Sequence, residues 1–363
     1  MSEHHILAIN PGSTSTKFAV YRNEQCVLNK TLRHSVDELS AYADIIEQFG
    51  YRKGMIIDAL VEEGIEIDRI KNIIGRGGLT YPLESGVYLV DQLMLQHARA
   101  GIYGKHASNL GPIIADYIAS QIPGAHAYIA DPVVTDELED IARITGHPKF
   151  RKRSIFHALN QKATARVHAR KTGRAYEEMR LIVVHLGGGV SVGAHLNGRV
   201  VDVNNALDGD GPFSPERSGS LPVGQLIDLC YSGKYSQAEI YRMIVGEGGY
   251  VAYLGTNNAL EVKNRAEAGD EAARMIEQAL GYQVAKSIGE MAVVLTGQVD
   301  GILLTGGMAY NETLVNQIKE RVGFIASVFV YPGEDELEAL AMNALMVARG
   351  ELKARKYAPR MDL

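Results

Sequence analysis

The 363-residue sequence has no tryptophan, only two cysteines and no long apolar run. Cys26 and Cys230 are far apart in the sequence and lack CxxC spacing, so neither a disulfide framework nor a structural zinc site is expected. A membrane-spanning helix needs about 20 mainly apolar residues, so none is expected. The first residues show no basic region followed by a long apolar stretch, as a signal peptide would. These absences predict a soluble cytoplasmic protein.

The sequence also has fewer basic than acidic residues. Lys and Arg number 37 against 43 Asp and Glu, which gives a net charge of -6. Nucleic acids are bound mainly by clustered Lys and Arg, so no nucleic-acid interface is expected. The partners should instead be small molecules. At 46% hydrophobic residues, the chain can build one or two cores of ordinary size, and two domains are the better prediction.

Short β-branched runs alternate with amphipathic stretches, which is typical of an α/β protein. We expect helices between these runs, the first beginning at Ser35 because Glu38 completes a capping box. The candidate strands are residues 6–9, 18–21, 70–74, 86–90, 127–130, 181–185, 190–196, 199–203 and 301–304.

Two segments of the chain repeat one pattern. Residues 6–28, ILAINPGSTSTKFAVYRNEQCVL, and 181–203, LIVVHLGGGVSVGAHLNGRVVDV, both show strand, glycine turn, strand, polar turn, strand. Aligning Asn10 with His185 pairs Gly12 with Gly187 and places Arg22-Asn23 opposite Asn197-Gly198, a hairpin-turn sequence. We expect a duplicated domain with its boundary near residues 150–154.

Glycine turns follow strands at three places, near Gly12, Gly187 and Gly306. Backbone N–H groups in such turns bind anions, and the missing side chains let phosphate oxygens approach. Ser13, Thr14, Ser15 and Thr16 would add hydroxyls. No GxxxxGK[ST] and no strand-linked GxGxxG is present, which argues against Walker-type and Rossmann sites. Any one of these turns could be an ordinary tight turn; three together favour phosphate binding.

Four polar residues stand at the ends of short apolar runs: Arg76, Asp131, His157 and Arg217. Ligands of open α/β sheets bind at the carboxyl ends of strands. Each residue also has a structural reading, as an ion-paired arginine, a turn-forming aspartate or a core histidine. The histidines show no metal-ligand spacing, so no zinc site is expected.

The order of the motifs resembles the acetate and butyrate kinase (acetokinase) family over nearly the whole chain, and its butyrate kinase branch in particular. The motifs that carry the resemblance are INPGSTSTK, GRGG, KHASNLG, SIFHALNQK, HLGGGVSV, DVNNALDGDGPF and TGGMAYN. It implies two duplicated actin-like (ribonuclease H-like) ATPase domains with an interdomain active-site cleft. They would cover residues 1–153, completed by a C-terminal helix at about 340–363, and 154–340, with the adenosine site.

The resemblance also assigns residues. A first phosphate-contacting turn would comprise Asn10, Gly12, Ser13, Ser15 and Lys17, and a second His185, Gly187, Gly188 and Gly189. The remaining assignments are Gly306 and Gly307 beside adenosine, and Arg76, Arg217, Asp131, His106 and His157 in catalysis. Acetate kinases usually carry Asn where this chain has Gly188 and Glu where it has Tyr310. The Tyr310 departure leaves Asp131, Glu338 or water-mediated contacts as the expected Mg²⁺ ligands.

The implied reaction is reversible phosphoryl transfer between Mg-ATP and butyrate or a branched analogue, giving an acyl phosphate and ADP. A carboxylic acid of pKa near 4.3 is already ionised at neutral pH, so its attack needs no general base. The alternatives are an acetate or propionate kinase, a sugar kinase with an Asp as base, and an actin-like ATPase. The family resemblance further implies a homodimer or a larger closed homo-oligomer.

Overall fold

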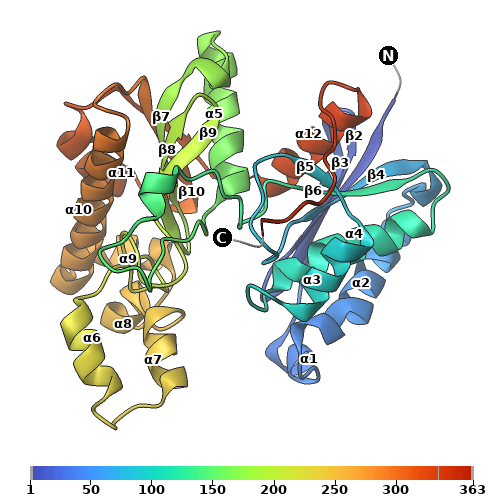
Figure 1. The fold of residues 1–363 in the computed structure, drawn as a ribbon. Coiled ribbons are helices and arrows are strands. Elements are labelled where there is room, and N and C mark those ends of the chain that lie inside the picture. The colour runs from blue at the N-terminus through green and yellow to red at the C-terminus, as the bar shows by residue number, and fades with distance from the viewer. Residues whose placement is uncertain (1–2, 334, 361–363) are drawn as a thin grey trace. The chain divides into compact units, whose positions relative to one another are not determined.

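The computed structural model describes residues 3–333 and 335–360. Its contacts divide the chain into unit 1, Met1–Thr135 with Asp335–Leu363, and unit 2, Asp136–Glu334. Each unit contains one sheet with helices on both faces (Figure 1). No helix within the described ranges is long and apolar enough to cross a membrane.

Unit 1 is built on a six-stranded sheet of order β3-β2-β1-β4-β6-β5. The strands are β1 (His5–Pro11), β2 (Ser15–Arg22), β3 (Gln25–Arg33), β4 (Ile70–Arg76), β5 (Val87–Leu89) and β6 (His126–Ala130). β1, β2 and β3 form an antiparallel meander, whereas β1, β4 and β6 run parallel. The helices are α1 (Val36–Ser40), α2 (Phe49–Glu62), α3 (Gln92–Ala100), α4 (Leu110–Ser120) and α12 (Glu336–Ala348), with 3₁₀ turns η1 (Ile45–Gln48), η2 (Ile67–Arg69) and η3 (Ala107–Asn109).

In unit 1, α4 packs on β4 and β6 while α12 covers β1 and β4 from the other face (Figure 1). Buried Leu, Ile, Val, Phe and Ala side chains of β1, β2, β4 and β6 and of α2, α3 and α4 form a core cluster of the unit. The capping box at Ser35 is confirmed, because its hydroxyl accepts from Glu38 N–H and the Glu38 carboxylate accepts from Ser35 N–H.

Unit 2 has a five-stranded sheet of order β11-β10-β7-β8-β9. Its strands are β7 (Arg180–Leu186), β8 (Val190–Leu196), β9 (Arg199–Val203), β10 (Gly301–Gly306) and β11 (Val328–Pro332). The 3₁₀ turns are η4 (Asp140–Arg143), η5 (Tyr176–Glu178) and η6 (Gly307–Tyr310). The helices are α5 (Ala158–Thr172), α6 (Val223–Cys230), α7 (Gln237–Ile244), α8 (Gly249–Leu254), α9 (Ala259–Glu267), α10 (Glu271–Val294) and α11 (Glu312–Val322). α5 packs on β7 and β10, and α10 covers β7 and β8 (Figure 1).

Both sheets contain the same arrangement of five strands, an antiparallel meander followed by two parallel strands, as the duplicated pattern predicts. Unit 1 adds a sixth strand, β5, which pairs antiparallel with β6 at the edge of the sheet. The alignment slips by one residue beyond the first turn. Pro11 pairs with Thr16 across a four-residue loop, whereas Leu186 pairs with Val190 across three residues. Asn23 therefore corresponds to Asn197, and both have positive φ, 51° and 50°.

The contacts divide the chain at Thr135, earlier than the boundary expected near residue 153. Residues between these points bind unit 2: Glu137 accepts from Lys162 Nζ at 2.6 Å and Lys152 Nζ reaches Asp202 at 2.6 Å. By its contacts the C-terminal helix α12 belongs to unit 1, and it begins at Glu336, four residues before the approximate start named from the sequence.

Candidate functional site

The first glycine turn joins β1 to β2 and comprises residues 12–15. Ser13 and Thr14 are exposed and Gly12 and Ser15 are half-buried, so the turn is open to a ligand. Thr16 differs from expectation. Its side chain is buried and contacts His34 Nε2 at 2.8 Å and Arg52 NH1 at 3.0 Å, so its hydroxyl faces the core instead of a phosphate.

Arg52 on α2 organises this turn from below. Its fully buried guanidinium donates to the carbonyl oxygens of Gly12 (2.7 Å), Ser13 (3.2 Å) and Ser15 (3.2 Å). Nε and NH2 also donate to Gln48 Oε1 at 3.0 and 2.8 Å. These three carbonyl oxygens point toward the Arg52 guanidinium on the protein side of the turn. The positive charge of the guanidinium therefore favours binding of an anion on the solvent side of the turn. Arg52 was not among the residues predicted from the sequence.

Asn10, Arg76 and Glu336 meet beside this turn. Arg76 NH1 lies 3.0 Å from Glu336 Oε2 and 3.4 Å from Asn10 Oδ1, and Asn10 Nδ2 donates to the same Glu336 oxygen at 2.5 Å. Both bonds of Arg76 use NH1, so within the described residues its Nε and NH2 groups donate no bond to protein. Lys17 is exposed and sits directly opposite Asn10 in the β1–β2 register, hence on the same face of the sheet.

Glu336 is a second residue that was not predicted from the sequence. It lies in the first turn of α12, and its side chain is 12% exposed. The predicted ligand Glu338, two residues later, is exposed, and its backbone N–H donates to Asp335 Oδ1 at 2.8 Å.

The GRGG segment, residues 75–78, fixes the backbone at Arg76 by close packing. A Cβ at Gly75 would stand 2.3 Å from Gly111 O, and one at Gly78 would stand 2.4 Å from Asn109 Oδ1. Asn109 Oδ1 in turn accepts from Leu79 N–H at 2.8 Å. Glycine is therefore needed here so that β4 can approach the start of α4.

Asp131 follows β6 and is 2% exposed. Its Oδ1 accepts from Ser85 Oγ at 2.6 Å and from Gly86 N–H at 2.9 Å. Its φ of 37° is in the left-handed region, which costs energy in a non-glycine residue and is common at functional sites.

His106 is exposed and caps η3, where its Nδ1 accepts from Ser108 N–H at 3.2 Å.

The second turn, Gly187–Gly189, joins β7 to β8 and carries Arg217 and His157 beside it. A Cβ at Gly189 would lie 2.1 Å from Arg217 NH1 and 3.1 Å from His157 Cε1, so both side chains rest against this glycine. Gly188 is exposed, and its carbonyl accepts from Ser214 Oγ at 2.7 Å. Ser214 thus holds a turn carbonyl as Arg52 does in unit 1.

His157 precedes α5 and stacks on His185, with ring centroids 3.8 Å apart. His185 is 1% exposed, and its Nδ1 contacts Asn160 Oδ1 at 2.8 Å. His157 is half-buried, with Nδ1 2.9 Å from Ser191 Oγ. The structure therefore brings His157, His185, Gly189 and Arg217 together.

The third turn behaves differently. Gly306 has φ of 92° and exchanges both backbone hydrogen bonds with Gly333, at 3.1 and 3.0 Å. A Cβ on it would stand 2.3 Å from Leu186 O, so Gly306 allows the end of β10 to pack on β7. Gly307 is exposed with open space around its Cα. Of the two residues predicted to border adenosine, only Gly307 has an open surface.

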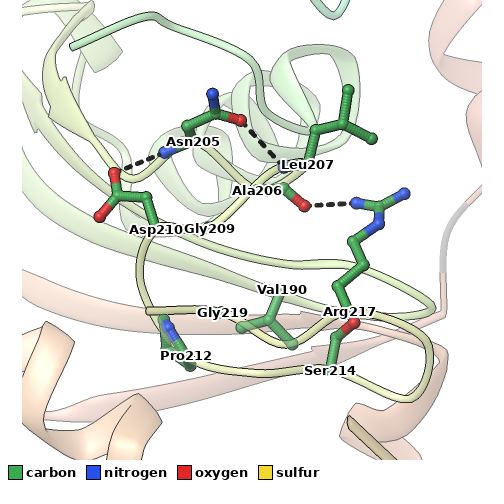
Figure 2. Close-up of a pocket in the computed structure, with 10 residues that line it drawn as sticks. All are labelled: Val190, Asn205, Ala206, Leu207, Gly209, Asp210, Pro212, Ser214, Arg217 and Gly219. Atoms are coloured by element: carbon green, nitrogen blue, oxygen red, sulfur yellow. Dashed lines mark hydrogen bonds between the residues drawn. The ribbon is translucent and has the colours of Figure 1, made fainter. Parts of the chain in front are cut away.

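A pocket in unit 2 lies beside Arg217 (Figure 2). Figure 2 shows the guanidinium turned toward Ala206, whose carbonyl accepts from NH1 at 2.5 Å. The space between its lining residues, about 170 Å³, is continuous with the solvent. The lining residues are Val190, Asn205, Ala206, Leu207, Gly209, Asp210, Pro212, Ser214, Arg217 and Gly219.

No group of three or more His, Cys, Asp or Glu side chains within residues 3–333 and 335–360 could hold a metal ion by itself. Mg²⁺ in kinases takes one or two protein carboxylates plus substrate phosphates and water. Glu336 lies with Arg76 and Asn10 beside the first turn, and Asp131 is held by Ser85 and Gly86 at the end of β6.

Comparison with known proteins gives a consistent picture. The sequence pattern of the acetokinase family matches residues 149–326. Butyrate kinase 2 of Clostridium acetobutylicum is 56% identical over 352 residues, covering 97% of this chain and 99% of its own. A probable butyrate kinase of Clostridium botulinum is 53% identical over 354 residues, covering 98% and 99%.

Among solved structures, acetate kinase of Porphyromonas gingivalis matches with a TM-score of 0.78 at 17% identity, over 95% of this chain and 100% of its own. At that identity the likeness concerns the fold alone. It agrees with the expected pair of actin-like domains.

Proposed function

Because the chain belongs to the acetokinase family, we propose that it phosphorylates a short-chain carboxylate, butyrate or a branched analogue, with ATP. The products are an acyl phosphate and ADP, and the reaction is reversible. The observation that carries the proposal is the arrangement of Arg76, whose NH1 is held by Glu336 and Asn10 while Nε and NH2 make no bond to the described residues. A planar fork of this kind suits carboxylate and phosphoryl oxygens.

The chemistry requires cations more than a base. The substrate carboxylate is already ionised, so the obstacle is the approach of one anion to another. The transition state of phosphoryl transfer spreads charge over the equatorial oxygens, and fixed donors stabilise it. We assign this role to Arg76 in unit 1 and Arg217 in unit 2.

The two glycine turns are assigned to the nucleotide phosphates. In the first, Arg52 ties three carbonyls inward, and Asn10, Gly12, Ser13, Ser15 and Lys17 supply the ligand face. In the second, Gly187, Gly188 and Gly189 supply it, with His185 buried behind. Gly307 is proposed to border adenosine, with Gly306 as its structural support.

His106 and His157 remain proposed active-site residues. His157 lies beside Arg217 against Gly189, which supports a contact with the transferred phosphoryl group. His106 is exposed at the start of η3, close in sequence to Asn109, which packs on the GRGG segment.

Mg²⁺ bound with ATP would neutralise charge on the phosphates. Glu336 uses only Oε2 in its bonds to Arg76 and Asn10, which leaves Oε1 for a cation or its water. We therefore propose Glu336, in preference to Glu338, together with Asp131 as the protein carboxylates that orient the metal.

A sugar kinase would need Asp131 as the base for a hydroxyl. Ser85 Oγ and Gly86 N–H both donate to Oδ1 of Asp131, so this oxygen is already used as an acceptor within the protein and is poorly placed to take a proton from a sugar hydroxyl. This favours a carboxylate acceptor. A cytoplasmic location and a closed homo-oligomer belong to the same proposal.

The test is acyl-phosphate formation trapped by hydroxylamine, with Mg-ATP and acids from acetate to valerate including branched isomers. We expect highest kcat/KM for four- or five-carbon acids. Neighbouring acids should differ by about 10- to 200-fold at most, since one methylene is worth about 1–3 kcal/mol. A preference for acetate or propionate would contradict the proposed substrate, and ATP hydrolysis without hydroxamate would contradict the proposed reaction.

A further inference from the structure

Five side chains of unit 2 form a continuous hydrogen-bonded set that leads from the core to His157. We call it the histidine network; its members are Tyr176, His195, Gln161, Ser191 and His157. The distances along it are 2.7 Å from Tyr176 OH to His195 Nδ1, 2.9 Å from His195 Nε2 to Gln161 Oε1, 2.7 Å from Gln161 Nε2 to Ser191 Oγ and 2.9 Å from Ser191 Oγ to His157 Nδ1.

The orientation of Gln161 sets the direction of every bond in this network. Its amide also lies 3.2 Å from the backbone carbonyl oxygen of Ser191, which can only accept. The NH₂ group of Gln161 must therefore face Ser191. Its carbonyl oxygen must face His195, so His195 Nε2 donates.

His195 is fully buried, and burial lowers its pKa well below the ordinary value of a histidine. The ring is therefore neutral at neutral pH. With its proton on Nε2, its Nδ1 accepts from the hydroxyl of Tyr176.

The hydrogen bond from Gln161 to Ser191 determines the direction of the hydrogen bond between Ser191 and His157. The Ser191 hydroxyl oxygen accepts from Gln161, and the Ser191 side chain is completely buried. Within the described residues, His157 Nδ1 is the acceptor within reach of the Ser191 hydroxyl hydrogen. If His157 Nδ1 carried a proton instead, that buried hydroxyl hydrogen would have no acceptor there, which proteins avoid.

Gly193 provides the space that this arrangement needs. A Cβ on Gly193 would stand 2.6 Å from Gln161 Oε1 and 3.4 Å from His195 Nε2. Any side chain at this position of β8 would displace the bond between Gln161 and His195.

We propose that the histidine network holds His157 as a neutral imidazole with its proton on Nε2, so that His157 donates a hydrogen bond to the transferred phosphoryl group. Ser191, Gln161 and His195 are then positioning residues. The role toward phosphoryl rests on the proposed function; the position of the proton does not. A lone pair on Nε2 would repel phosphoryl oxygens, whereas an N–H matches the charge they carry in the transition state. Arg217, against the same glycine, supplies the positive charge.

The direct test is nitrogen NMR of the full-length protein with ¹⁵N-labelled histidine, in which protonated and unprotonated ring nitrogens have separate shifts. The signals of His157, among eleven histidines, are identified by their loss in His157→Asn. We expect an unprotonated Nδ1 and a protonated Nε2 at neutral pH. A proton on Nδ1, with or without one on Nε2, overturns the proposal.

Gln161→Glu is the matched variant, because it replaces the donor that faces Ser191 by an acceptor. The serine hydroxyl then turns to the introduced carboxylate, and the His157 proton should move to Nδ1. Gln237→Glu, the same change at an exposed position of α7, should leave the His157 signals as in the wild type. An unchanged tautomer in folded Gln161→Glu overturns the network's role; if that variant does not fold, the wild-type spectrum decides.

Kinetics separate positioning from folding. Ser191→Ala should lower kcat about 10-fold with KM for the acid within a few-fold, and Ser191→Thr, which keeps the hydroxyl, should restore kcat. Equal loss in both variants contradicts a role for the hydroxyl. If the protein proves inactive on every acid while NMR shows the expected proton, the proposed function fails and the tautomer assignment stands.

Discussion

At the scale of single residues, the most informative side chain is that of Arg52, which belongs to none of the sequence motifs. Arg52 is separated by 40 residues from Gly12, to which it donates, and has zero exposure. Its hydrogen-bond acceptors within the described residues are carbonyls, a hydroxyl and an amide rather than a carboxylate, so its charge is available to the turn. Burial lowers its pKa from the ordinary value, but a guanidinium stays charged at neutral pH.

We predict that Arg52→Met raises KM for ATP and lowers kcat/KM by 10-fold or more. A hydrogen bond to a charged group is worth about 1.5–3 kcal/mol, and 1.4 kcal/mol is tenfold in rate. Steady-state kinetics with ATP varied would show this. Lys53→Met, the next residue, lies over the Tyr117 ring and not under the turn, and should leave KM for ATP unchanged. Normal KM in Arg52→Met would remove Arg52 from phosphate binding.

For the proposed catalytic arginines, Arg76→Ala and Arg217→Ala should each lower kcat/KM by about 100-fold or more, since one electrostatic donor is worth at least ~2.7 kcal/mol. Arg274→Ala, an exposed α10 arginine paired with Glu271, is the control and should change little. Activity within a few-fold of the wild type would exclude that arginine from the mechanism.

At the scale of elements, the sequence predicted the features that depend on neighbouring residues, such as turns. It did not predict the features that depend on contacts between distant segments. The turns at Gly12 and Gly187 were recognisable because glycine and hydroxyl residues interrupt apolar strands within a few positions. Strand β11 was not predicted, because its residues are only partly buried and Pro332 ends it, as is typical of a sheet edge.

Glu338 was named from the sequence, whereas Glu336, the carboxylate that contacts Arg76 in the structure, was not considered. Both lie in one acidic stretch, and which carboxylate meets Arg76 depends on the rotation of α12 against β1 and β4. Arg52 was missed for a similar reason. An arginine on an amphipathic helix usually faces solvent, and only the tertiary packing of α2 places it under the turn.

We predict that Gly189→Ala lowers kcat by about 100-fold, because a Cβ 2.1 Å from Arg217 NH1 must displace that guanidinium. Gly289→Ala on α10, where a Cβ meets nothing within 4 Å, is the matched control and should keep full activity. Thermal melts of both variants would show whether the fold survives. A fully active Gly189→Ala enzyme would mean that Arg217 need not occupy this position.

At the scale of the whole molecule, stability should depend on buried histidines. Burial lowers the pKa of His34, His168 and His195 below the ordinary value of 6.5. The unfolded chain therefore binds more protons than the folded protein once the pH falls below about 6.5.

Linkage then predicts that the free energy of unfolding decreases as the pH is lowered from 7 through about 5.5. Urea midpoints measured across this range would show it, and His195→Gln should reduce the slope. A midpoint that is constant or rises on acidification would contradict this reading of the buried rings.

The central claim is that the protein makes an acyl phosphate from ATP and a carboxylate. Phosphorus NMR of the enzyme with Mg-ATP and butyrate tests it most directly. We expect an acyl-phosphate resonance that grows in step with ADP, and the return of ATP when purified acyl phosphate and ADP are supplied. Release of ADP with inorganic phosphate alone, or phosphorylation of a sugar in place of the acid, would contradict the claim.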